Sequence, residues 1–123
     1  MRTGELALDR SNAGSAVLTV SGEHDLNTAP ELRSQLDQMI EDGDPIVIDL
    51  SPATFVDSSI LGVVLDARRR AAGAGIGFAV THGNGADAVA RVLEITGLRG
   101  ELPVHTSREK ALAQAAGGSG RQP

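Results

Sequence analysis

The sequence predicts a single layered α/β domain with a mixed, mostly parallel sheet of about five strands and about four helices. Three observations favour this fold. The chain has 123 residues, which is enough for one hydrophobic core but not for two. Two short β-prone segments near the start flank a turn, as in an antiparallel hairpin. Beyond them, apolar runs typical of buried strands alternate with helical patterns, and this alternation is typical of parallel sheets.

The two β-prone segments form the predicted hairpin. Residues 5–10 alternate weakly between apolar and polar side chains, and residues 17–20 are a β-prone run that ends at Gly22. Residues 12–14 between them have the composition of a turn.

A helix is predicted from Thr28 to Gly43. Thr28 and Glu31 have the spacing of a capping box, in which the hydroxyl and the carboxylate each accept a hydrogen bond from the other residue's backbone N–H. Pro30 lies in the first turn, where its missing N–H costs little, and Gly43 ends the helix. The inward face has helical spacing and consists of Leu32, Leu36, Met39 and Ile40.

The remaining elements alternate between strands and helices. Residues 46–48 are a continuous apolar run, which predicts a strand buried on both faces, and residues 49–57 are a connection. The elements expected after it are a helix over 58–72, a strand over 76–81, a helix over 86–96, a strand over 102–104 and a helix over 107–115. Residues 1–116 are therefore expected to form one domain, followed by a disordered Gly/Ser-rich tail over 117–123.

Composition narrows the classes of function. Sixteen acidic and eleven basic residues give a net charge of −5, so no nucleic-acid partner is expected. The only aromatic residues are two phenylalanines, and there is no cysteine, which removes stacking platforms, disulfides and thiol nucleophiles. No apolar run approaches the roughly 20 residues that span a bilayer, and the N-terminus lacks a signal-peptide core. We therefore expect a cytoplasmic chain without direct membrane insertion.

The order of the elements predicts where a functional surface lies. Crossovers between parallel strands are right-handed, so the loops that follow the strands gather at the carboxyl ends of the strands. Three segments are therefore expected to meet at one end of the sheet, namely residues 22–28, 51–58 and 82–85.

The segment 55–62 has the most informative composition. Ser58 and Ser59 stand where a helix begins, and unpaired N–H groups and the helix dipole would stabilise a phosphate there. The alternative is that Asp57 or Ser58 is only an N-cap. Gly62 lies inside the same helix, and close packing of the helix on the sheet is the preferred explanation for it.

Other candidate sites are weaker. A metal site from His24, Asp25 and Asp57 lacks ligand spacing, and no G-x-S-x-G elbow supports a hydrolase, so no metal, cofactor or catalytic residue is expected. The glycine-rich residues 73–77 follow a helix and precede a strand, which is the reverse of a dinucleotide fingerprint. Residues 68–70 are three arginines, which are interpreted as a solvated helix end.

Five segments together resemble a known family. They are Gly-Glu-His-Asp at 22–25, Thr-Ala-Pro-Glu-Leu at 28–32, Ile-Val-Ile-Asp-Leu at 46–50, Phe-Val-Asp-Ser-Ser-Ile-Leu-Gly at 55–62 and Arg-Val-Leu-Glu-Ile-Thr-Gly-Leu at 91–98. This combination is similar to the bacterial anti-sigma factor antagonists, which are STAS domains. The resemblance covers residues 6–112 and implies a STAS-like layered fold.

The resemblance also implies a mechanism. Such an antagonist binds an anti-sigma factor, often a serine kinase of the GHKL type, and thereby frees a sigma factor. The kinase phosphorylates the residue that corresponds to Ser58, which ends binding, and a serine phosphatase restores it. The implied partner-binding residues are Glu23, Asp25, Thr28, Asp57, Ser58, Ser59 and Ile60.

Two residues depart from the family pattern. Ile60 stands where the family usually has glycine, so its bulk is expected to hinder a kinase cleft. His24 replaces a residue that is typically aliphatic, which is expected to affect the choice of partner. Two rival classes remain: a STAS accessory subunit of a membrane transporter or lipid-transport assembly without a kinase cycle, and a small enzyme or nucleotide-binding protein.

Overall fold

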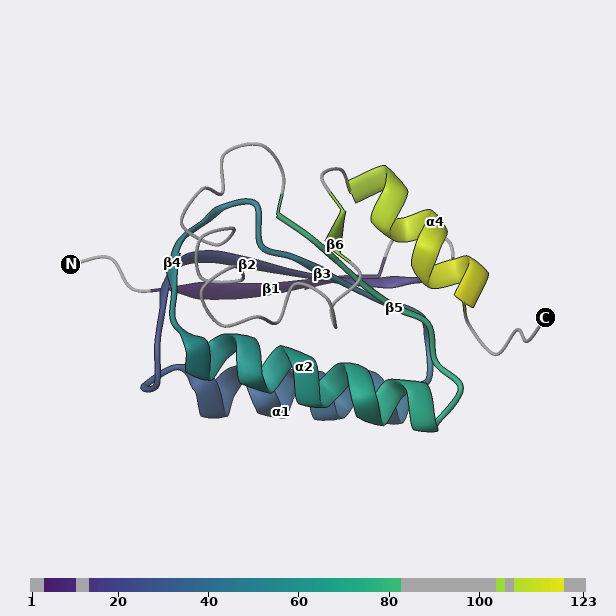
Figure 1. The fold of residues 1–123 in the computed structure, drawn as a ribbon, viewed down its shortest axis with the longest axis horizontal. Coiled ribbons are helices and arrows are strands. Elements are labelled where there is room, and N and C mark those ends of the chain that lie inside the picture. Colours follow the sequence, from purple (N-terminus) through teal and green to yellow (C-terminus); the bar gives the residue numbers. More distant parts are fainter. Residues whose placement is uncertain (1–3, 11–13, 83–103, 106–107, 119–123) are drawn as a thin grey trace.

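The structure is a computed structural model that describes residues 4–10, 14–82, 104–105 and 108–118 (Figure 1). Its elements are β1 (Glu5–Asp9), β2 (Ala16–His24), α1 (Ala29–Asp42), β3 (Ile46–Asp49), β4 (Ala53–Val56), α2 (Ser58–Gly73), β5 (Phe78–Thr81), β6 (Val104–His105) and α4 (Arg108–Gly118). The helix predicted over residues 86–96 lies outside the described residues.

The sheet is mixed and mostly parallel, as predicted. Its strands follow the order β1-β2-β3-β5-β6, and β4 pairs with β2 off this path. Only the β1–β2 pair is antiparallel among the described strands, which confirms the N-terminal hairpin. The helices α1 and α2 cover one face of the sheet, and α4 lies against the other face (Figure 1).

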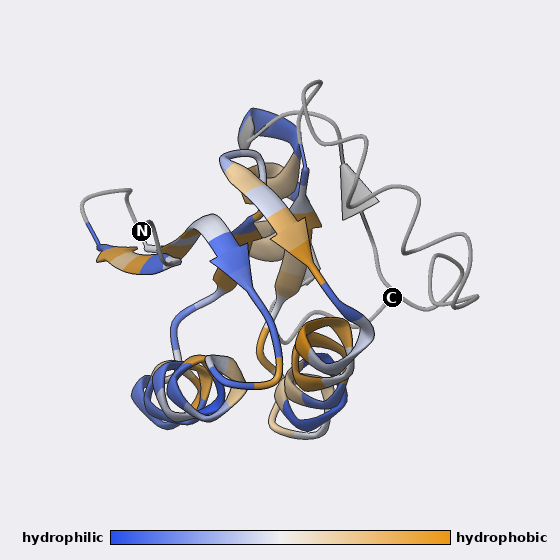
Figure 2. Cartoon of the chain, turned by 90° about the vertical axis from the view of Figure 1, so that its left-hand side faces the viewer, coloured by the Kyte–Doolittle hydropathy of each residue, from blue (hydrophilic) through white to orange (hydrophobic). Residues whose placement is uncertain are grey.

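The core has two layers that share the central strands. In Figure 2 the hydrophobic sides of α1 and α2 are turned inward and their hydrophilic sides face solvent. Ile46 and Ile48 of β3 pack in the larger cluster with α1 and α2, whereas Val47 packs in the smaller cluster with Ala111 and Ala115 of α4. The apolar run at 46–48 is therefore a strand buried on both faces, as predicted.

The start of α1 differs from the prediction. Thr28 has a helical backbone with φ −98° and ψ −6°, and its side chain does not cap the helix. Its hydroxyl instead lies 3.1 Å from both the N–H and the carbonyl oxygen of Asp25. The capping box with Glu31 is therefore wrong, because the turn before the helix competes for the same hydroxyl. The end of α1 is as predicted, with Gly43 in the left-handed region at φ 86°.

The strand β4 was not expected, and β2 is longer than expected. The predicted loop at 22–25 is strand through His24, because β4 pairs in parallel with residues 22–24. The register shifts between Gly22 and Glu23. The sequence does not reveal β4, because the strand has only four residues, two of them exposed, and follows directly after Pro52.

The arginines near the end of α2 are more than a solvated helix end. Arg70 forms ion pairs with Asp37 of α1 at 2.8 Å and with Asp66 at 3.0 Å, and Arg33 of α1 pairs with Asp66 at 3.1 Å. The hydrogen bond from Arg33 lowers the pKa of the Asp66 carboxyl below its ordinary value. Two of these pairs, Arg33–Asp66 and Arg70–Asp37, join α1 to α2, and because all three are exposed each adds little to stability.

The last helix also differs from the prediction. α4 continues to Gly118, which is two residues into the segment that the sequence assigned to a disordered tail. Glycine is a weak helix former in a helix interior but is common at helix ends, so composition alone placed the end too early. Residues 119–123 lie outside the described residues.

Candidate functional site

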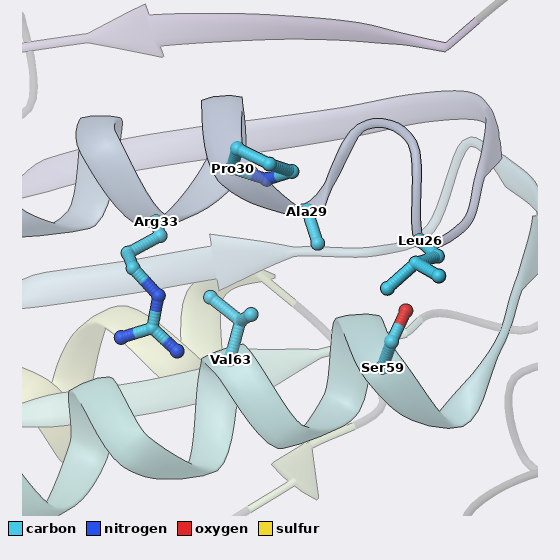
Figure 3. Close-up of a pocket in the computed structure, with 6 residues that line it drawn as sticks. All are labelled: Leu26, Ala29, Pro30, Arg33, Ser59 and Val63. Carbon is cyan, nitrogen blue, oxygen red and sulfur yellow. The ribbon is translucent and has the colours of Figure 1, made fainter.

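Two of the three predicted segments meet at the carboxyl end of the sheet. The turn between β2 and α1 lies against the first turn of α2, where Leu26 and Ser59 line the same groove (Figure 3). The backbone N–H of Leu26 also helps to lower the pKa of the Asp57 carboxyl. Only His82 of the third segment, 82–85, is described, and its side chain is buried.

Asp57 is the N-cap of α2. Its Oδ1 atom accepts hydrogen bonds from the backbone N–H of Ser59 at 3.0 Å and of Ile60 at 3.2 Å. Burial raises the pKa of the Asp57 carboxyl, but the hydrogen bonds from the Ser59 side chain and from the N–H groups of Ile60, Ser59 and Leu26 outweigh it. The pKa therefore lies below its ordinary value, and the carboxylate is charged at neutral pH.

The two adjacent serines have different surroundings. The Ser59 hydroxyl donates to Asp57 Oδ1 at 2.5 Å, and its side chain is half-buried. Ser58 is exposed, and its hydroxyl makes no hydrogen bond within the described part of the chain. Ser59 thus belongs to the cap, whereas the Ser58 hydroxyl stands free in solvent at the helix N-terminus.

The turn between β2 and α1 presents carboxylates next to α2. Asp25 is half-buried, and its side chain accepts from the backbone N–H of Asn27 at 2.9 Å, while Glu23 is exposed. Thr28 directs its hydroxyl inward to Asp25 and to the imidazole of His24. Of the predicted partner-binding residues on this turn, Glu23 and Asp25 present charge to solvent, whereas the Thr28 hydroxyl is used within the turn.

Ile60 does not lie on this surface. Its side chain is fully buried in the core between the sheet and the helices α1 and α2. The expectation that Ile60 contacts a partner or hinders a kinase cleft is therefore wrong for this conformation. The physical reason is the helical period, because residue 60 points to the opposite side of α2 from Ser58.

Gly62 also contradicts its predicted role. The residue is exposed, and within the described part of the chain no atom outside the helix's own backbone lies within 4 Å of the position that a Cβ would occupy. Close packing on the sheet therefore does not explain it. Gly62 follows Ser58 by four residues, so the two lie one turn apart on the same side of α2.

An apolar groove runs from this site between α1 and α2 (Figure 3). It has a volume of about 390 Å³ and is lined by Leu26, Ala29, Pro30, Arg33, Ser59 and Val63. Leu26 is 70% exposed and Phe55 is 45% exposed, and they are the large exposed apolar side chains of the described residues. The exposure of Leu26 was not predicted, although an isolated leucine between Asp25 and Asn27 in a polar turn indicates a surface position.

The charged side chains of the site are carboxylates. Among the residues that the structure describes, no ion pair involves Glu23, Asp25 or Asp57. The same part of the chain contains no group of three His, Cys, Asp or Glu side chains that could hold a metal ion. Both ring nitrogens of His24 are engaged inside the fold, so His24 does not serve as a base for Ser58.

Comparison with known proteins shows the family. A family model described as "Mlab, STAS domain" matches residues 7–105, and the chain belongs to the STAS domain family. The anti-sigma F factor antagonist of Paenibacillus polymyxa is 32% identical over 103 residues, which are 82% of this chain and 86% of that protein.

Solved structures agree with this assignment. An anti-sigma factor antagonist from Mycobacterium paratuberculosis is 27% identical with a TM-score of 0.79, over 93% of this chain and 95% of that one. A putative anti-sigma factor antagonist from Thermotoga maritima shares the fold at 21% identity with a TM-score of 0.77, over 90% of this chain and 94% of that one. Within the described ranges, no helix has the length and apolar character needed to cross a membrane.

We predict that Asp57→Ala lowers the free energy of unfolding at pH 7 by about 1 kcal/mol, because α2 loses its cap. The folded-state pKa of Asp57 is lowered, so its contribution is complete above the unfolded-state pKa and is lost as pH falls through the folded-state pKa. Urea unfolding of both proteins from pH 7 to pH 3 measures this. A stability difference that does not shrink in acid would contradict the assigned role.

We also predict that Gly62→Ala raises the free energy of unfolding by about 1 kcal/mol, because alanine is the better helix former and the added methyl group meets open space. Gly43→Ala is the matched control. Its methyl group also meets no atom, but Gly43 has φ +86°, so this change should lower the stability by about 1 kcal/mol. Equal effects of the two changes in urea unfolding would contradict the prediction.

Proposed function

We propose that this chain is an anti-sigma factor antagonist. In this proposal the chain acts as one cytoplasmic regulatory domain without catalytic activity. The surface formed by Glu23, Asp25, Asp57, Ser58 and Ser59 binds an anti-sigma factor and thereby frees a sigma factor. The observation that carries the proposal is the exposed Ser58 hydroxyl at the N-terminus of α2, beside the Asp57 carboxylate that caps this helix.

The relatives support this class of function. The protein from P. polymyxa is named as an anti-sigma F factor antagonist. The antagonist SpoIIAA shares the fold in its unphosphorylated form at a TM-score of 0.72, and the Bacillus SpoIIAA in its phosphorylated form does so at 0.66. Each of these two is 21% identical to this chain. A kinase of the GHKL type as partner and a serine phosphatase that reverses the modification are part of the proposal for this chain.

Accessibility favours Ser58 over Ser59 as the phosphoacceptor. A kinase must reach the hydroxyl oxygen and remove its proton. The Ser59 hydroxyl already donates that proton to Asp57 at 2.5 Å, whereas the Ser58 hydroxyl is exposed. Phosphorylation of Ser59 would break the cap, and phosphorylation of Ser58 would leave it intact.

A phosphate on Ser58 would change the surface more than the fold. It adds a charge of about −1.5 to −2 to a chain with a net charge of −5. The helix N-terminus stabilises that charge locally, so α2 would remain folded. The phosphate would nevertheless stand beside the charged Asp57, and a partner that closes over a neutral hydroxyl would meet added bulk, like charge and a desolvation cost.

Gly62 supports a contact along the same side of α2. A helix-interior glycine costs about 1 kcal/mol relative to alanine, and nothing within 4 Å requires it here. Without a Cβ, a partner can approach the helix backbone one turn from Ser58. In this proposal a phosphate on Ser58 would hold the partner away from that contact.

The test measures the affinity of the chain for each serine-kinase-type anti-sigma factor encoded in its source genome. Wild type and Ser58→Ala are expected to bind alike, because an exposed hydroxyl is lost without disturbing the cap. Ser58→Asp and the Ser58-phosphorylated chain are expected to bind at least about tenfold more weakly. Ser58→Asn, which adds the bulk of aspartate at the same position without its charge, is the matched control and is expected to bind more tightly than Ser58→Asp.

Two outcomes would contradict the proposal. One is equal binding of the wild-type and Ser58-phosphorylated chains. The other is capture of membrane-transporter subunits with no anti-sigma factor, which would favour the accessory-subunit alternative.

A further inference from the structure

The side chain of His24 is buried at the end of β2. It is 1% exposed, and both of its ring nitrogens have partners inside the fold. Nε2 lies 3.0 Å from the carbonyl oxygen of Ser21, and because a carbonyl only accepts, Nε2 carries the proton. In the neutral ring, Nδ1 accepts from the Thr28 hydroxyl, whose oxygen lies 3.1 Å away, and it shares that single proton with the Asp25 carbonyl oxygen at the same distance.

The imidazole is also enclosed from the side of the N-terminus. A Cβ atom at Gly4 would lie 2.2 Å from Nε2 of His24 and 2.4 Å from the carbonyl oxygen of Glu23. Real Cβ atoms do not approach so closely, so only glycine fits there. The absence of a side chain at Gly4 therefore lets the chain close over His24.

Thr28 links the imidazole to the turn that presents Asp25. Its hydroxyl oxygen accepts from the backbone N–H of Asp25 at 3.1 Å. The Asp25 carbonyl in turn accepts from the backbone N–H groups of Thr28 at 3.0 Å and Ala29 at 3.1 Å. The hydroxyl thus joins both ends of the turn and ties them to His24.

The same turn also lies against the N-terminus of α2. Leu26, the residue after Asp25, lines the same groove as Ser59, and its backbone N–H helps to lower the pKa of the Asp57 carboxyl. That carboxylate accepts hydrogen bonds from the backbone N–H groups of Ser59 and Ile60. Hydrogen bonds therefore tie the buried imidazole to the turn, and the turn lies against the cap that stands beside Ser58.

We propose that His24 is a positioning residue for partner binding, which holds the Asp25–Leu26 corner in register with the start of α2. The inference rests on the proposed function, since it assigns how that binding surface is held. His24 does not touch the partner, because it is buried. An aliphatic side chain would fill the same space without two polar atoms that need partners, so core packing alone does not account for an imidazole here. Thr28 acts with it, as a positioning residue and not as a contact.

Three variants separate the two contacts of the ring. An asparagine amide reaches the place of Nδ1 and a glutamine amide reaches the place of Nε2, whereas leucine reaches neither with a polar atom. His24→Asn, which keeps a partner for Thr28, is expected to bind the anti-sigma factor like wild type. His24→Leu and His24→Gln are expected to bind at least about threefold more weakly, which is the scale of coupling within one hydrogen-bond network.

Two further measurements distinguish positioning from a general role in folding. The midpoint of thermal unfolding of His24→Leu should not fall, because leucine is well suited to a buried site. A double-mutant cycle of His24→Leu with Thr28→Val should be non-additive in binding affinity, since both changes break the same contact. Amide NMR signals of Leu26 and Ser59 should shift in His24→Leu, whereas those of α4 should not.

The outcomes separate this inference from the proposed function. If no serine-kinase-type anti-sigma factor binds the wild-type chain, both fail. If wild type binds and folded His24→Leu binds equally well, this inference alone is overturned. An additive cycle with Thr28→Val, or a loss of binding by His24→Leu that follows a lowered unfolding midpoint, would also overturn it.

Discussion

The arrangement of the candidate site depends on one carboxylate. Asp57 accepts hydrogen bonds from the N–H groups of Ser59 and Ile60 in the first turn of α2 and from the hydroxyl of Ser59. These bonds fix where the helix begins, and the β2–α1 turn lies against that first turn, where Leu26 and Ser59 line one groove. Because Asp57 and Ser59 satisfy each other, the hydroxyl of Ser58 is left exposed to solvent. The difference between the two adjacent serines, one bonded in the cap and one exposed, thus follows from helix capping and requires no special feature of the backbone.

The same constraint explains how a modification could act without refolding the chain. The cap lies on one side of the helix start, and the exposed serine lies on the other, so a phosphate would not replace any hydrogen bond of the fold. What changes is the outer surface, where the carboxylates of Glu23, Asp25 and Asp57 have no ionic partner among the described residues. Beside this surface, ion pairs of Arg33 with Asp66 and of Arg70 with Asp37 join α1 to α2.

Much of the fold could be predicted from periodicity, and the errors have local causes. The hairpin, the doubly buried β3 and the presence of α1 and α2 followed from periodicity and turn composition, although the capping box predicted at the start of α1 is wrong. The strand β4 could not be predicted, since four residues with two exposed side chains show no strand pattern. The orientation of Thr28 depends on its contact with His24, and the exposure of Gly62 depends on which side of α2 faces the sheet. The sequence predicted that Ser58 and Asp25 share one surface, but it could not show that Ile60 is buried, that Leu26 is exposed and that Ser59 is bound to the cap.

The most direct test of this account is site-resolved phosphorylation. The chain would be incubated with ATP and an anti-sigma factor of the serine-kinase type that binds it, and the peptide that contains both serines would be fragmented in a mass spectrometer. The account predicts phosphate on Ser58 and none on Ser59, with Asp57→Ala losing this selectivity because the Ser59 hydroxyl is released. Phosphate on Ser59 in the wild-type chain, or equal modification of the two serines, would contradict it.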